Sequence, residues 1–126
     1  MTLKLRQLFL IDGLGALLSV FMLGFVLVRL ESYFGIPISV LYVLAAIPIF
    51  FALYDFLCYF FLQKGFPPYI KAIALANISY CIFSLVLAFF HRDSITLFGW
   101  LYIVGEILIV VFLSLWEWRL ASASSE

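Results

Sequence analysis

Residues 39–62 read SVLYVLAAIPIFFALYDFLCYFFL, and Asp55 is the one charged residue in this stretch. A helix rises about 1.5 Å per residue, so about 20 apolar residues are enough to cross the hydrocarbon core of a bilayer. The stretch meets that length, and its apolar residues follow one another without the alternation that marks a membrane β-strand. It therefore predicts a transmembrane helix.

Three further stretches have the same character, and together the four predict an all-α fold. They cover about residues 8–28, 69–90 and 95–118. The connections between the four are short, and short connections make consecutive helices antiparallel neighbours. We therefore expect a single domain over residues 1–126, built as a four-helix transmembrane bundle that runs up-down-up-down.

The composition of the whole chain supports this placement. Hydrophobic residues make up 67% of the 126 residues and charged residues 11%, with a formal net charge of zero. A soluble domain has about 45–50% apolar and about 25% charged residues, so lipid has to solvate the excess apolar surface here. The balanced charge leaves no basic surplus that would bind a nucleic acid.

The basic residues in the loops and at the ends of the predicted spans indicate the orientation, because cytoplasmic loops are enriched in lysine and arginine. Two basic residues, Arg29 and Arg92, lie on one side of the predicted membrane. Five lie on the other side: Lys4, Arg6, Lys64, Lys71 and Arg119. The bias predicts that both termini lie in the cytoplasm and that the protein is a multi-pass protein of the inner (plasma) membrane.

Four strongly polar residues lie inside the predicted spans: Asp12, Asp55, Asn77 and Glu106. An acidic residue at the centre of a span costs about 2.5–3.5 kcal/mol on insertion, and no lysine or arginine accompanies these residues at depth. Carboxyl groups without basic partners have to be protonated, hydrogen-bonded or neutralised by a bound cation. These side chains are therefore the candidates for function.

Each predicted span carries one face of small or polar residues, because residues three or four apart lie on the same side of a helix. These faces hold, in chain order, Asp12, Gly15, Ala16 and Ser19; Pro48, Asp55, Cys58 and Tyr59; Asn77, Tyr80, Cys81, Ser84, Ala88 and His91; and Gly99, Tyr102, Glu106, Leu113 and Glu117. We expect the four faces to meet in a polar pocket that opens toward the cytoplasm, with Glu106 at its floor. Pro48 should free the carbonyl of Leu44 on the same side.

We expect the candidate site to bind a proton or a cation. Asp55 and Glu106 are the predicted binding groups, Asp12 forms the cytoplasmic entrance, and Asn77 and Tyr80 orient the carboxyl groups.

Simpler interpretations stay open for some of these residues. Asp12 lies near the predicted interface, where it could cap a helix or pair with a basic residue (Lys4, Arg6 or Arg119). Asn77 and Tyr80 could form hydrogen bonds between helices without binding anything. We expect Glu117 to lie at the interface.

Catalytic and metal-binding signatures are missing from the sequence. It contains no GxSxG, no HExxH, no glycine-rich phosphate loop and no pair of histidines. We therefore expect a protein that is not an enzyme and that has no cofactor and no metal site. Cys58 and Cys81 lie in apolar runs outside any CxxC motif, which is typical of buried small residues, although a disulfide between spans stays open.

Four segments together resemble a group of small, uncharacterised four-span bacterial integral membrane proteins. These segments are LFLIDGLGALLS at 8–19, FGIP at 34–37, ALANISYC at 74–81 and GEILIV at 105–110. The resemblance extends over nearly the whole chain. It implies a membrane protein of four spans, and it brings no known activity, substrate or cofactor.

Three functions are compatible with these observations. The first is proton- or cation-coupled transport through an intramembrane carboxylate site, with a homodimer expected because four helices leave little room for a path. The alternative is a non-catalytic accessory or assembly subunit that binds a membrane partner protein. A lipid- or quinone-binding role would use the many aromatic residues, but ordinary membrane composition explains these more simply.

Overall fold

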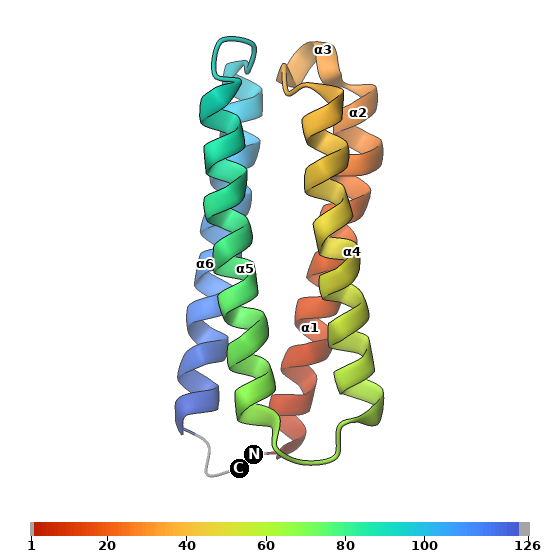
Figure 1. Cartoon of the computed structure of the whole chain (residues 1–126), viewed down its shortest axis with the longest axis vertical. Coiled ribbons are helices and arrows are strands. Elements are labelled where there is room, and N and C mark those ends of the chain that lie inside the picture. The colour runs from red at the N-terminus through yellow and green to blue at the C-terminus, as the bar shows by residue number, and fades with distance from the viewer. Residues whose placement is uncertain (1, 124–126) are drawn as a thin grey trace.

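The computed structural model describes the backbone of residues 2–123 and the side chains of residues 5–123. The described part contains helices and no strands, which confirms the all-α prediction (Figure 1). The elements are α1 (Thr2–Phe21), a π-helical segment η1 (Met22–Val26), α2 (Leu27–Arg29), α3 (Glu31–Phe34), α4 (Ile38–Phe61), α5 (Phe66–Phe90) and α6 (Leu97–Ala123).

Four helical stretches are long and apolar enough to cross a membrane, and the chain is a multi-pass membrane protein. They are Leu5–Arg29, Ile38–Phe61, Phe66–Phe90 and Leu97–Ala123. The first of these runs from α1 through η1 into α2 without a break. The first and third helices begin before the predicted starts of their spans and the fourth continues past its predicted end, because a helix can continue past the apolar stretch that defines a span.

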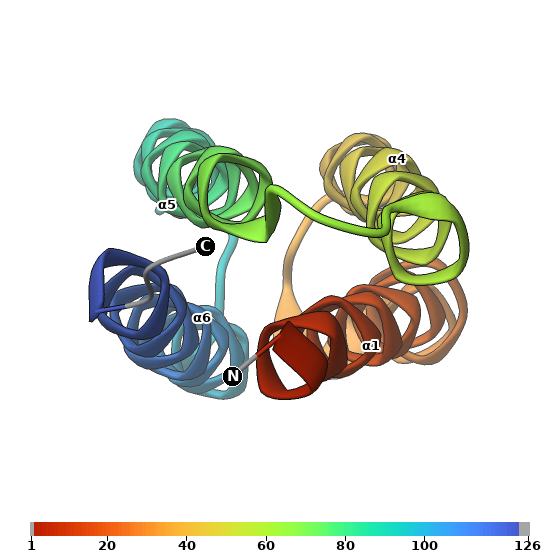
Figure 2. The same ribbon diagram turned by 90° about the horizontal axis from the view of Figure 1, so that it is seen from below.

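The helices form two antiparallel pairs, with α1 packed along α4 and α5 packed along α6 (Figures 1 and 2). Contact between the two pairs is sparser, and it involves α1 with α5 and α6, and α4 with α5. The beginning of α1 and the end of α6 lie at the same end of the bundle (Figure 1). The predicted four-helix bundle is confirmed, although consecutive helices α4 and α5 are not the closest neighbours.

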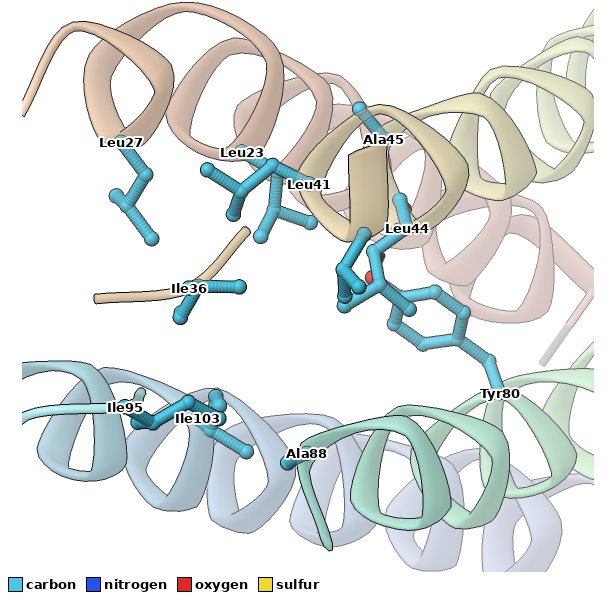
Figure 3. Packing of buried hydrophobic residues seen from close by; sticks show 11 residues of the cluster. Leu23, Leu27, Ile36, Leu41, Leu44, Ala45, Tyr80, Ala88, Ile95 and Ile103 are labelled. Carbon is cyan, nitrogen blue, oxygen red and sulfur yellow. Dashed lines mark hydrogen bonds between the residues drawn. The ribbon is translucent and has the colours of Figure 1, made fainter. Parts of the chain in front are cut away.

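Apolar side chains fill two parts of the interior. One cluster lies toward the end away from the termini and includes Leu27, Leu41 and Ile103 (Figure 3). The other surrounds Phe9 and Phe66 near the termini. Large apolar side chains also cover the outer faces of the helices, where lipid solvates them. Both cysteines are buried and free.

The end opposite the termini is closed by hydrogen bonds between the two pairs. Thr96 donates its backbone N–H to the Phe34 carbonyl at 3.0 Å and its hydroxyl to the Tyr33 carbonyl. The Ser94 hydroxyl donates to the carbonyl of Gly35 at 2.9 Å. Gly35 has a φ of 73°, a left-handed conformation that glycine adopts without strain.

Candidate functional site

Three buried carboxyl groups from three different helices meet inside the bundle. Asp12 on α1, Asp55 on α4 and Glu117 on α6 are 4%, 0% and 1% exposed. The Asp12 carboxyl lies within hydrogen-bonding reach of Asp55 and also of Glu117. We call these three residues the carboxyl cluster, and Asp12 is its central member.

One donor side chain serves the carboxyl cluster. Asn77 on α5 donates from Nδ2 to Oδ1 of Asp12 at 2.9 Å. Among the described residues no donor reaches the other oxygens, which are Oδ2 of Asp12 and both carboxyl oxygens of Asp55 and Glu117. Two ionised carboxylates in contact repel strongly where water is excluded, so neighbouring groups have to share a proton or a cation.

Gly13 brings α1 close enough to α4 for this contact. A Cβ atom added at Gly13 would lie 3.2 Å from the Cβ of Asp55 and 3.1 Å from the ring of Phe56, which is tighter than ordinary side-chain packing. The small residue beside Asp12 therefore sets the distance between the two helices at the level of the carboxyl cluster.

One of the alternatives left open for Asp12 is wrong. Asp12 is not an interfacial cap: it lies in the body of α1 with Asn77 as its partner, while Arg6 donates to the carbonyl of Tyr59. The side chain of Lys4 lies outside the described residues. Glu117 is buried inside the bundle and α6 continues for more than a turn beyond it, while its expected depth at the interface stays a prediction. Glu117 shares a helical face with Glu106, and this spacing was the feature of the sequence that indicated an inward side chain.

A pocket of about 460 Å³ lies between the two helix pairs. Its polar lining consists of Asp12, Ser19, Asn77, Tyr80, Tyr102 and Glu106. The Tyr102 hydroxyl donates to Oε2 of Glu106 at 3.3 Å, and Ser19 also lies within hydrogen-bonding reach of that carboxyl group. Most of the remaining lining is apolar, so Glu106 is an acidic group on the wall of a mainly apolar pocket.

Asp55 and Glu106, the two predicted binding groups, lie in two neighbouring places. Asp55 belongs to the carboxyl cluster and does not line the pocket, whereas Glu106 lines the pocket. Asp12 belongs to both, because it contacts Asp55 and also lines the pocket wall. Asp12 therefore connects the two places.

Tyr80 binds a backbone carbonyl and not a carboxyl group. Its hydroxyl donates to the carbonyl of Leu44 at 3.0 Å, across the gap between the two helix pairs (Figure 3). Leu44 lies four residues before Pro48, which has no N–H to offer, so the sequence predicted this free carbonyl. Asn77 donates to Asp12, which fits both its predicted orienting role and a simple hydrogen bond between helices, while Tyr80 ties α5 to α4.

We expect Tyr80→Phe to lower the free energy of unfolding by about 1 kcal/mol, because the buried carbonyl of Leu44 loses its donor. Pro48→Ala restores a helical N–H to the same carbonyl, so Tyr80→Phe should cost much less in that background. Unfolding in detergent, followed by tryptophan fluorescence, measures both costs. Equal costs in the two backgrounds would contradict the proposed link between Pro48 and Tyr80.

Comparison with protein families, curated proteins and solved structures gives no match. The resemblance to small four-span bacterial membrane proteins stays a prediction. The function therefore has to be argued from the geometry of the carboxyl cluster and the pocket.

Proposed function

We propose that the protein carries out proton- or cation-coupled transport, and that the carboxyl cluster binds the coupling ion. The observation that supports this most is that three buried carboxyl groups lie together and that, among the described side chains, they have one donor, which is Asn77 bonded to Asp12. Such an arrangement is costly for a membrane bundle, and ionisable groups in spans typically mark ion pathways. A proton is the simplest occupant, because it converts two repelling carboxylates into a hydrogen-bonded pair.

The position of Asp12 supports a relay between the carboxyl cluster and the pocket. Glu106 and Glu117 lie on the same helix, eleven residues apart, which corresponds to about 16 Å along the axis. Asp12 contacts Glu117 and also lines the pocket that contains Glu106. A proton released by Glu106 toward the pocket would therefore meet Asp12 next on its way to the cluster.

The inward direction of the polar side chains favours transport over the accessory-subunit alternative. The carboxyl cluster and Asn77 are buried within the chain itself. The outer faces of the helices present mainly large apolar side chains. A membrane partner would therefore meet apolar surface and would leave the costly acidic groups without a role.

The orientation, the membrane and the oligomeric state stay predictions. We expect both termini in the cytoplasm, which a fluorescent or periplasm-dependent reporter fused to the C-terminus would detect. A homodimer is the expected assembly, and native mass spectrometry after mild extraction would detect either that dimer or a different partner protein.

Removing single carboxyl groups from the cluster tests the proposed function. We expect Asp55→Asn and Glu117→Gln each to reduce proton flux by about tenfold or more, because each removes one proton-binding group from the path. Flux is measured with a pH-sensitive dye inside liposomes that contain the purified protein. Glu31→Gln is the matched control, since Glu31 is exposed on α3 outside the spans, and it should conduct like the wild type. Wild-type flux in both cluster variants would rule out the proposal.

A further inference from the structure

The pocket opens toward lipid between α1 and α6. Leu18 on α1, with Leu101 and Ile109 on α6, line the pocket and are nevertheless 61%, 60% and 70% exposed on the outside of the bundle. These two helices lie next to each other along one side of the bundle (Figure 2). In a bilayer the rim of the pocket therefore faces acyl chains, and a molecule dissolved in the membrane could enter from the side.

The walls of the pocket combine apolar surface with acidic groups. The Tyr102 hydroxyl donates to Glu106 at 3.3 Å, and Ser19 also lies within reach of that carboxyl group. Asp12 is a second acidic group on the wall, and its buried Oδ2 has no donor among the described residues. Among the side chains that the structure describes, no lysine or arginine belongs to the lining. A complementary ligand has one positive charge and a largely apolar body.

The pocket also has room for such a body. Gly15 and Gly105 both line the pocket, and a Cβ atom added at either one would meet no atom within 4 Å. The volume of about 460 Å³ falls within the range of about 300–1,000 Å³ that is typical of small-molecule sites. A bare metal ion would leave these apolar walls unused, and an acyl chain would leave Glu106 without a counter-charge.

We propose that the pocket binds an amphipathic organic monocation that enters from the bilayer between α1 and α6 and pairs with Glu106. This inference rests on the proposed transport function and names the class of its substrate. The apolar body of the ligand packs against the pocket walls, and its charge pairs with a carboxylate from which water is largely excluded. Asp12 lies near enough to the pocket for the ligand to be coupled to the carboxyl cluster.

Binding of tetraphenylphosphonium to the purified protein in lipid nanodiscs tests the inference, with empty nanodiscs subtracted. We expect saturable binding, whereas tetraphenylborate, an anion of the same shape, should not bind. Glu106→Gln should weaken phosphonium binding about 30-fold, because the ligand loses the group that neutralises its charge. Gly105→Leu should abolish binding by filling open space. Leu108→Phe is the matched control, since Leu108 lies on the same helix, faces lipid and does not line the pocket.

Three outcomes would overturn the inference: absence of saturable phosphonium binding to the wild type, equal binding of tetraphenylborate, or wild-type affinity in Glu106→Gln. The test does not depend on the folding of one variant. The comparison of the two ions uses the wild-type protein, and Gly105→Leu is a second variant that leaves Glu106 unchanged. Loss of proton flux in the cluster variants without phosphonium binding would leave the proposed function standing and reject this site. Phosphonium binding to the wild type together with unchanged flux in the cluster variants would support this site and reject the proposed function of the carboxyl cluster.

Discussion

Replacement of Gly99 by alanine should destabilise the bundle by about 3 kcal/mol or more, at the upper end of the cost of overpacking. A Cβ atom at this position would lie 2.1 Å from the carbonyl oxygen of Phe34 and 2.8 Å from the side chain of Ile95. The Phe34 carbonyl accepts the backbone N–H of Thr96, which joins the two helix pairs. The added methyl group would therefore push apart the hydrogen-bonded end of the molecule.

The matched control for Gly99→Ala is Gly105→Ala, because both glycines lie in α6. A Cβ atom at Gly105 meets open space, and alanine is a better helix former than glycine by about 0.5–1 kcal/mol. Gly105→Ala should therefore unfold at the same temperature as the wild type or at a slightly higher one. Unfolding of the three proteins in one detergent, followed by tryptophan fluorescence, measures the difference. A Gly99→Ala protein as stable as Gly105→Ala would contradict the observed packing of Phe34.

Asp55→Asn should stabilise the protein by about 2 kcal/mol while it removes proton-coupled transport. The two carboxyl oxygens of Asp55 are fully buried and have no donor in the described part of the chain, and burying such a group costs several kcal/mol. Asparagine has the same shape, carries no charge and offers an N–H to the free Oδ2 of Asp12. Opposite changes in stability and flux are expected where a protein retains a costly group for its function.

Asn77→Leu provides the contrast to Asp55→Asn, because it removes the donor that holds Asp12. We expect this variant to lose about 2 kcal/mol of stability, since Oδ1 of Asp12 would then be buried without a partner. The same unfolding assay measures both variants, and size-exclusion chromatography checks that each one is folded. A loss of stability in Asp55→Asn would show that the three carboxyl groups support the fold and are not a cost to it.

Much of the architecture followed from residues that are neighbours along the chain. The run of apolar residues on both sides of Pro48 was enough to predict a membrane helix, and the missing N–H of Pro48 predicted a free carbonyl at Leu44. The helical spacing of Asn77 and Tyr80 placed both side chains on the inner face of their helix. Both side chains do form hydrogen bonds with other helices.

The partners of the acidic residues did not follow from the sequence. Spacing along a helix predicts the face on which a residue lies, but it does not predict how far one helix is shifted or rotated against the next. The close approaches at Gly13 and Gly99 decide those shifts. They bring Asp12 to Asp55 and Glu117, and leave Glu106 in the pocket.

The sequence by itself determined that the chain forms four membrane-spanning helices with acidic residues on their inner faces. That much depends on the transfer of apolar and charged side chains between water and lipid, which is a property of each segment alone. Only the tertiary structure decided that three carboxyl groups form one cluster and that Glu106 lines the neighbouring pocket. Lipid solvates every apolar face of a membrane helix about equally well, so the contacts between helices depend on close packing of particular side chains.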